Sequence, residues 1–293
     1  MSSDLLGALA VVKASPDHRV LTRLERRASY GVVESPLYGL YLDTETTSLD
    51  TTTAKVVEFA AIRFEFSRVG QVGRIVEVYS GLEDPGQPLP AEVVALTGLT
   101  DEMVRGRKLD DADVTSIADG CTLVIAHNAG YDRPIVERRW PSVFNRLPWA
   151  CSWRDVDWAQ FGCACSKLAH LLSYACGEFF DAHRALDDCR VGLHVLAAAQ
   201  LDGRSALSHL LESAGQETFR VWAHDAPYRM KDVLKARGYR WHDGSGGRAK
   251  AWYFDARDGD REAERAWLRA NVGIEPWVDG ITALNRYSVR SGT

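Results

Sequence analysis

The sequence predicts an α/β domain with a mixed sheet flanked by helices, followed by a small α+β domain. Two observations predict this class. Runs typical of strands come first and then alternate with helical patterns, and the composition changes after about residue 217, where tryptophan and basic residues become frequent. At 293 residues, the chain is long enough for one large core and a smaller second one.

The elements of the first domain follow from local patterns. Three runs rich in β-branched and aromatic residues predict an antiparallel meander, and a fully apolar run predicts a fourth, buried strand; these runs are residues 37–47, 55–66, 73–84 and 121–129. Thr100 precedes two acids as a helix N-cap, and Gly177 is a C-cap. The expected helices lie within 88–106 and at 131–140, 166–177 and 184–201.

The pattern of the second domain predicts a strand, a helix, a hairpin and a closing helix. The helix ends at Gly238, and the hairpin turns at a Gly/Ser stretch, 244–248. The domain boundaries that we predict are a helical or irregular lead-in at 1–36, the main domain at 37–200, a linker at 201–217 and the basic, aromatic-rich domain at 218–293.

Composition limits the class of protein. The net charge of −5 argues against an indiscriminate nucleic-acid coat, but residues 1–214 hold 21 basic and 29 acidic side chains, whereas residues 215–293 hold 14 and 11. No apolar run approaches the length of a membrane helix, and Asp4 stands where a signal peptide would carry a basic residue. We therefore expect a cytoplasmic protein with no membrane partner.

Six cysteines are scattered along the chain without paired spacing. Cys163 and Cys165, with Cys151 and Cys176 nearby, are the nearest approach to a zinc site. Their intervals do not fit one, so we expect reduced thiols in the core.

Two acids on one strand indicate a metal site. Asp43 and Glu45 are two residues apart in LYLDTETTSL, so their side chains point to the same face. Two uncompensated carboxylates would repel one another unless a cation joined them. Hard oxygen ligands suit Mg²⁺ or Mn²⁺.

Three residues further along complete the pattern. Asp132 and Asp188 arrive from two predicted helices to make a four-carboxylate cage. Two divalent ions about 3.5–4 Å apart in such a cage can clamp the attacking and leaving oxygens of a phosphoryl displacement. His183 lies just before the helix that carries Asp188, where a histidine can deprotonate the attacking water. Each residue alone has an ordinary structural explanation, and only the ordered set indicates catalysis.

The set resembles the DEDDh branch of the DnaQ-like 3′–5′ exonucleases, particularly exonuclease X-like and DNA polymerase III epsilon-like members. The motifs that carry the resemblance are LDTETTSL, LTGLTDEMV, AHNAGYDRPIVERR and HRALDD, and they cover about residues 37–200. The resemblance implies a ribonuclease H-like fold, two divalent ions (Mg²⁺ or Mn²⁺), and release of nucleoside 5′-monophosphates from a 3′ end. His183, Asp43, Glu45, Asp132 and Asp188 would be the catalytic residues, the four acids holding the metals.

The resemblance also implies a place for the substrate. Thr46 and Thr47 would contact the terminal nucleotide through backbone amides, and Asn128 would lie near the substrate strand. Family members commonly have glycine where this chain has Ser48, a change that could reshape the terminal-nucleotide pocket.

Other polar residues receive structural interpretations. Glu58 is expected to have a local partner, Asp187 to lie on the surface and His127 to brace a loop; His170 and His194 are expected to be ordinary helix residues.

The second domain combines cations with aromatic residues, as surfaces that bind unpaired bases and phosphates do. Between residues 227 and 254, seven basic side chains accompany two acids. The predicted substrate-binding residues are Arg229, Lys231, Lys235, Arg237, Arg240, Trp241, Arg248, Lys250 and Trp252. The alternatives are that the aromatic residues form this domain's core and that the domain recruits a protein partner.

The function that we predict is a metal-dependent 3′–5′ exonuclease acting on single-stranded or 3′-ended DNA, in repair, end trimming or proofreading. An exoribonuclease of the RNase T or oligoribonuclease type is the alternative, since this set of residues does not distinguish DNA from RNA. A non-catalytic nucleic-acid-binding protein on a nuclease fold is a third interpretation. The five intact residues argue against that third interpretation.

Overall fold

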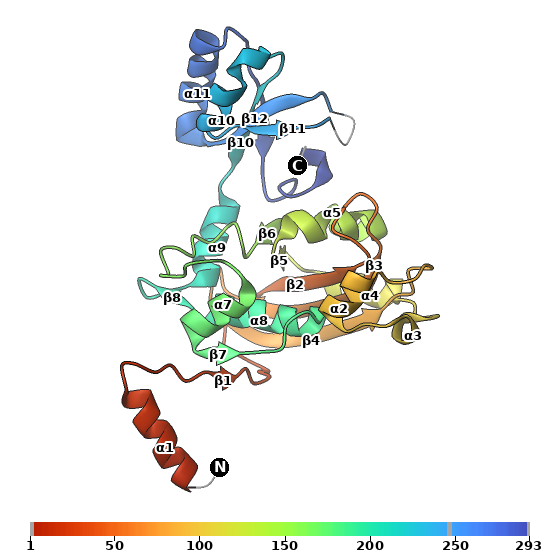
Figure 1. Ribbon diagram of the computed structural model, residues 1–293, viewed down its shortest axis with the longest axis vertical. Coiled ribbons are helices and arrows are strands. Elements are labelled where there is room, and N and C mark those ends of the chain that lie inside the picture. The colour runs from red at the N-terminus through yellow and green to blue at the C-terminus, as the bar shows by residue number, and fades with distance from the viewer. Residues whose placement is uncertain (1–2, 245–247, 292–293) are drawn as a thin grey trace.

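The computed structural model describes residues 3–244 and 248–291. Figure 1 shows a central layered domain, a smaller C-terminal unit on one side of it and an N-terminal helix, α1 (Ser3–Ala14), that reaches away on the other side. The predicted α/β class with a mixed sheet is confirmed. Within the described residues, no helix is both long and apolar enough to cross a membrane.

The central sheet has five strands in the order β4-β3-β2-β5-β6. β2 pairs antiparallel with β3, which pairs antiparallel with β4, and β5 and β6 add parallel strands on the other side of β2. Their bounds are β2 (Leu37–Thr46), β3 (Val56–Phe66), β4 (Val72–Leu82), β5 (Leu123–Ala126) and β6 (Trp149–Cys151). The meander and the buried fourth strand were predicted, whereas β6 was not.

Side chains on β2 alternate between two cores, as the strand period requires. Tyr41 lies in the core on the side of α8 (Ala185–Ala198), and Leu40 and Leu42 lie in the core on the side of α5 (Ala129–Arg139). α8 crosses β2 closely at Gly192, where a Cβ atom would lie 1.9 Å from the Tyr41 hydroxyl. This glycine lets α8 pack against β2 one turn after Asp188.

Shorter elements surround the sheet. Thr100 accepts the amide of Met103 as the predicted N-cap, and Gly177 ends a π-helical turn in the left-handed conformation. The remaining elements of this domain are β1 (Thr22–Arg23), α2 (Ala91–Thr97), α3 (Asp101–Val104), α4 (Asp111–Ala118), α6 (Pro141–Phe144), α7 (Leu168–Leu171), η1 (Leu172–Cys176), β7 (Glu178–Phe179), β8 (Gln200–Leu201) and β9 (Arg204–Ser205).

The segment that we expected to be a linker, 201–217, contains a folded helix, α9 (Ala206–Gly215). Ala206, Leu207 and Leu210 are buried in the same core as α8. The amphipathic spacing of these residues explains why the helix packs instead of crossing open space. The central domain therefore continues to about residue 215.

The C-terminal unit is a four-stranded antiparallel sheet in the order β11-β12-β10-β13. Its elements are β10 (Thr218–Ala223), η2 (Tyr228–Met230), α10 (Lys231–Ala236), β11 (Arg240–His242), β12 (Ala251–Arg257), α11 (Asp258–Asn271), β13 (Trp277–Ile281) and η4 (Val289–Ser291). The predicted elements are present, with Gly238 left-handed after α10. β13 was not predicted, and the tip of the predicted hairpin turn, 245–247, lies outside the described residues.

Candidate active site

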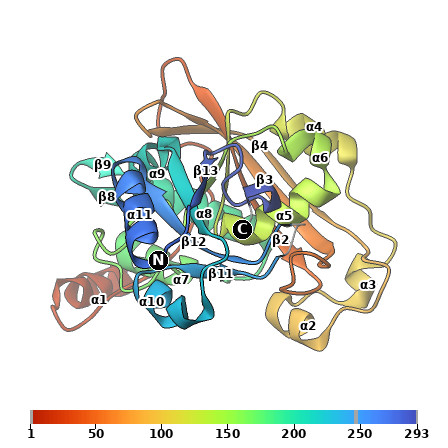
Figure 2. The ribbon, with the colours of Figure 1, turned by 90° about the horizontal axis from the view of Figure 1, so that it is seen from above.

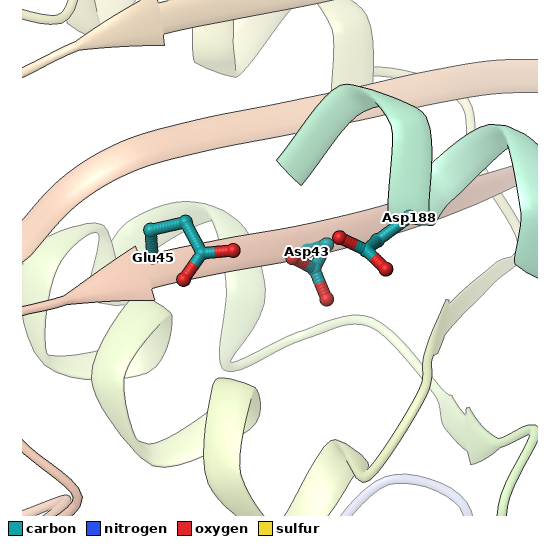
Figure 3. Close-up of side chains that lie close together, drawn as sticks. All are labelled: Asp43, Glu45 and Asp188. Carbon is teal, nitrogen blue, oxygen red and sulfur yellow. The ribbon is translucent and has the colours of Figure 1, made fainter. Parts of the chain in front are cut away.

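β2 presents two carboxylates at its carboxyl-terminal end. Asp43 and Glu45 are partly exposed, whereas Thr44 and Thr46 between and after them are buried, which is the alternation that their spacing predicts. Figure 3 shows the two acids along one side of the strand with Asp188 of α8 beside them. One oxygen of each of these three carboxylates lies within 4.8 Å of the others.

Asp188 reaches the site from the first turn of α8. Its Oδ2 accepts hydrogen bonds from the backbone amides of His183, at 2.9 Å, and Arg184, at 3.1 Å. These amides precede the helix, so the carboxylate satisfies donors that the helix leaves free and fixes the loop that carries His183.

Asp132 lies at the site's edge in a different arrangement. It is buried in the first turn of α5, and its Oδ1 accepts the amide of Thr44 at 3.1 Å and the hydroxyl of Thr44 at 2.8 Å. It is outside the group of three mutually close carboxylates, although it is near enough to raise the pKa of Asp43. The structure thus brings three predicted ligands together, and the fourth stays a prediction.

Burial raises the pKa of every carboxyl group at this site. Desolvation is the largest cause in each case, and the neighbouring acids add to it for Asp43 and Glu45. The pKa of Asp43 is well above its ordinary value, that of Glu45 is about 8, and those of Asp132 and Asp188 are each about 7. A cation bound beside these groups would stabilise the ionised carboxylates that burial disfavours. This is the electrostatic property expected of a metal site.

An ion pair beside the site, between the buried Glu58 and the exposed Arg184, was not predicted as such. Glu58 lies on β3 directly opposite Glu45, and its carboxylate pairs with Arg184 at 2.9 Å and accepts the amide of Ala185 at 3.2 Å. We expected Glu58 to have a local partner, and its partner is instead Arg184, 126 residues further along the chain. The pair ties the start of α8 to β3, so it helps to hold Asp188 against β2.

His183 is exposed and adopts a left-handed backbone with φ of 69°. Such a conformation is uncommon for a residue other than glycine, and here the hydrogen bond of its amide to Asp188 supports it. Its role as a general base stays a prediction.

The residues expected to contact the terminal nucleotide differ in whether their hydrogen-bonding groups are already occupied by other parts of the protein. The amide of Thr47 already donates to the carbonyl of Lys55 at 3.0 Å, so it is occupied within the sheet. The Thr46 hydroxyl contacts the hydroxyl of Tyr131, which also donates to the carbonyl of Ser48 at 2.7 Å. Asn128 is the left-handed N-cap residue of α5. Tyr131 was missed, although it directly precedes Asp132 in the motif.

His127 and Asp187 lie as their structural interpretations predict. His127 bonds to Ser152 and to the carbonyl of Ser166, and burial lowers its pKa to about 4, so it braces two loops in the neutral form. Asp187 pairs with Arg190 at the surface. All six cysteines are free thiols; four are buried as expected, whereas Cys176 is partly buried and Cys165 is exposed, which corrects the expectation that all lie in the core.

The C-terminal candidates divide into paired and unpaired charges. Ion pairs join Arg237 to Glu264, Arg240 to Asp255 and Arg248 to Asp279. Four of these candidates form no ion pair with any residue that the structure describes: Arg229, Lys231, Lys235 and Lys250.

The two tryptophans among these candidates differ in exposure. Trp241 is 52% exposed. Trp252 is 8% exposed and packs in the core, which corrects the expectation that it contacts substrate. It is buried because its position on β12 faces the helices.

The C-terminal segment returns to α5, and no sequence pattern indicated this. The guanidinium of Arg133 is fully buried and donates to the carbonyls of Ala283, Leu284 and Arg286. Glu137, one turn later, accepts a hydrogen bond from Ser288. In Figure 2 the last described segment of the chain, in dark blue, lies beside α5. The helix that carries Asp132 is therefore bound to the end of the chain.

Comparison with known proteins decides the family. A protein-family model described as "RNase_T: Exonuclease" matches residues 40–196, a range that contains Asp43, Glu45, Asp132, His183 and Asp188. The chain belongs to this exonuclease family. This family generally uses divalent metal ions.

Curated relatives share part of this domain. The chain is 30% identical over 103 residues to DNA polymerase III PolC-type of Listeria innocua serovar 6a and 29% identical over 111 residues to that of Bacillus subtilis strain 168. These matches cover 34% and 36% of the chain. They cover 7% of each polymerase, so the chain corresponds to a small part of those relatives.

Two solved structures are similar to the chain, and the likeness to the first of them shows the fold. Escherichia coli Exonuclease I, in complex with a dA16 oligonucleotide, is 15% identical and covers 81% of this chain and 72% of its own, with a TM-score of 0.50. Exonuclease X in complex with 5′ overhanging duplex DNA is 21% identical and covers 58% and 99%, with a TM-score of 0.40. The ribonuclease H-like fold that the resemblance implied is thereby confirmed.

Proposed function

We propose that the protein is a metal-dependent 3′–5′ exonuclease that removes nucleoside 5′-monophosphates from DNA. The observation that carries this proposal is the group formed by Asp43, Glu45 and Asp188, with His183 on the loop that Asp188 holds, inside an exonuclease domain. The DNA oligonucleotide bound to Exonuclease I and the DNA polymerase relatives support DNA as the polymer.

The residues fit a pair of divalent cations. Asp43, Glu45 and Asp188 supply hard oxygen donors, and none of the three forms an ion pair with a basic side chain that the structure describes. Asp132 lies next to them. Mg²⁺ or Mn²⁺ held there would polarise the phosphate and stabilise charge on the attacking and leaving oxygens. Their carboxylates must lose protons to bind the ions, so binding strengthens as the pH rises.

The remaining residues would bind the strand and move the proton. His183 would accept the proton of a water molecule as its oxygen adds to phosphorus, and the bond from phosphorus to the 3′ oxygen of the preceding nucleotide would break. Asp188 holds the backbone amide of His183, which keeps the histidine beside the carboxylates. The amide of Thr46 and the side chain of Asn128 would hold the terminal nucleotide.

A gel assay tests the proposal. Single-stranded DNA and RNA of one sequence, labelled at the 5′ end, are incubated with Mg²⁺ or Mn²⁺ and, separately, with EDTA. The proposal predicts a ladder that shortens from the 3′ end, faster for DNA, with mononucleotides as the only product and nothing in EDTA. Faster cleavage of RNA would assign the exoribonuclease function instead. Binding of both polymers without cleavage of either would favour the non-catalytic interpretation.

A further inference from the structure

The C-terminal sheet has one face covered by helices and one without them. Val221 and Ala223 of β10 and Trp252 and Ala256 of β12 alternate onto the covered face, where they pack with Leu234 of α10 and Leu268 of α11. Trp222 and Tyr253, which alternate with them along the strands, point the opposite way, as strand geometry requires. Figure 1 shows α10 and α11 on the side of the sheet away from the central domain.

The opposite face carries arginine and aromatic side chains in a cross-strand row. Trp222 lies opposite both Trp277 and Tyr253, and Tyr253 lies opposite Arg240. The Arg240 guanidinium lies 4.8 Å from the centre of the Tyr253 ring, and its side chain is 50% exposed. Arg257 lies on this face too, because it is four residues after Tyr253 on β12.

This face looks across a cavity to the active-site end of α5. The cavity has a volume of about 590 Å³. Arg240, Tyr253 and Arg257 line it on one side, and Asn128 and Tyr131 line it on the other. Tyr131 directly precedes Asp132 on α5, and Asn128 is the N-cap residue of that helix, whereas the four candidate catalytic carboxylates are not among the described residues that line the cavity.

Two cations of the cavity have no acidic partner. Arg154 and Arg257 are exposed, and neither forms an ion pair with any residue that the structure describes. Arg154 follows β6 in the central domain and lies over Trp153, and Arg257 ends β12 in the C-terminal unit. Free arginines on both walls suit an anionic ligand that passes between the two units.

We propose that this cavity holds the single strand behind its 3′-terminal nucleotide, with Arg154 and Arg257 on its phosphates; this inference rests on the proposed exonuclease function. A space of this volume accommodates a ligand of the size of one or two nucleotides and excludes a duplex. The inference moves the C-terminal contribution from α10 to the exposed Arg240 and Arg257 on the opposite face of the sheet, where Trp222 and Tyr253 are buried. Lys231 and Lys235, predicted from the sequence as contacts, belong to the helix that covers the other face.

Salt-dependent binding tests the inference. Fluorescence anisotropy with a labelled 12-nucleotide single-stranded DNA in EDTA gives Kd as a function of salt concentration without cleavage. Loss of two phosphate contacts should reduce the slope of log Kd against log salt by about 1.4 in an Arg154→Ala/Arg257→Ala variant. Both side chains are exposed and unpaired, so folding should be unaffected.

A charge-matched variant controls for net charge. Arg265→Ala/Arg269→Ala removes two arginines of α11, which lie on the helix side and pair with Glu275. Its slope should equal that of the wild type. An unchanged slope in Arg154→Ala/Arg257→Ala, an equal loss in the α11 variant, or wild-type protein without salt-dependent binding would overturn the inference.

Photocrosslinking locates the strand independently. DNA with 4-thiothymidine at the second or third nucleotide from the 3′ end should attach to peptides containing residues 251–257 or 128–131. Attachment to the peptide of α10 instead would overturn the inference. The gel assay keeps the two proposals separate: DNA degradation with an unchanged slope refutes only the cavity, whereas binding in the cavity without degradation refutes only the proposed reaction.

Discussion

The C-terminal unit pairs its buried charges, whereas the central domain gathers like charges at the end of β2. Arg220 is 3% exposed and pairs with Asp255 at 2.6 Å, and the buried Glu264 pairs with Arg237. Asp43 and Glu45 instead lie beside Asp188, whose charge raises the pKa of both. The first arrangement serves folding. The second arrangement is unfavourable for folding, and clusters of this kind are typical of functional sites, where the negative charge serves binding or catalysis.

The largest expected effect is on catalysis. Asp43→Asn should lower turnover of single-stranded DNA at least about a thousand-fold, because it removes a ligand that positions the divalent ions. It should leave thermal stability in EDTA equal or higher, since it also removes a repulsive charge. Turnover and melting temperature are measured on the same preparation.

Asp187→Asn is the matched control for this variant. Asp187 adjoins Asp188 but pairs with Arg190 at the surface, so its substitution should leave both turnover and melting temperature near those of the wild type. Lower stability in Asp43→Asn than in the control would show that Asp43 stabilises the fold. That result would contradict the contrast drawn between the carboxylates at the end of β2 and the paired charges of the C-terminal unit.

The opposite behaviour is expected in the C-terminal unit. Asp255→Ala should reduce the free energy of unfolding by about 3 kcal/mol, because it leaves the buried guanidinium of Arg220 without its carboxylate. Glu212→Ala, which breaks the exposed pair with Arg204, should cost about 1 kcal/mol or less. Urea denaturation measures both. Equal costs would mean that the two pairs do not differ in burial as described.

His183→Ala should lower the turnover number about a hundred-fold or more, with Kd for DNA in EDTA nearly unchanged, because a general base acts in the chemical step. The pH profile adds a second readout, because the dependence of the turnover number on pH in the acidic range should change in the variant. A variant with the wild-type rate and pH profile would exclude His183 as the base.

The smallest effect is a pH dependence of stability without metal. The pKa values of about 8 for Glu45 and about 7 for Asp188 lie above those of an unfolded chain, so the folded state retains protons that the unfolded state has released. The free energy of unfolding in EDTA should therefore fall as the pH rises from 7 to 8.5. The low pKa of His127 affects stability only below about pH 6.5, outside this window.

Differential scanning fluorimetry across this range checks the slope. Asp188→Asn should flatten it, and Mg²⁺ or Mn²⁺ should stabilise the wild type more at pH 8 than at pH 6. A wild-type stability that rises with pH in this range would contradict the raised pKa values.

Local patterns predicted what local physics controls. The spacing of Asp43 and Glu45 on a β-rich run and the position of Asp188 in a helix predicted their common face, and the structure brings them together. The short strands β6 and β13 escaped prediction because three to five residues show little periodicity. The bond of Asp132 to Thr44 depends on how α5 meets β2, which a pattern does not encode.

Contacts between distant segments were the least predictable. Arg133 and the carbonyls that it binds are about 150 residues apart, and a basic residue in a helix ordinarily indicates an exposed face. Trp252 and Tyr253 are adjacent, so composition alone could not tell which of them faces the helices. Strand register determines that Trp252 faces the helices, and the overall topology brings the carbonyls to Arg133.

Titration of Mn²⁺ into the metal-free protein tests the central claim most directly, with the bound ion counted by electron paramagnetic resonance and proton release measured alongside. The account predicts that wild-type protein binds Mn²⁺ and releases protons at pH 7, because the carboxyl groups with raised pKa values must ionise. Asp43→Asn should bind far more weakly, and Asp187→Asn should bind as the wild type does. Equal Mn²⁺ binding by Asp43→Asn and the wild type would contradict the account, because the carboxylates at the end of β2 would then not be the metal centre.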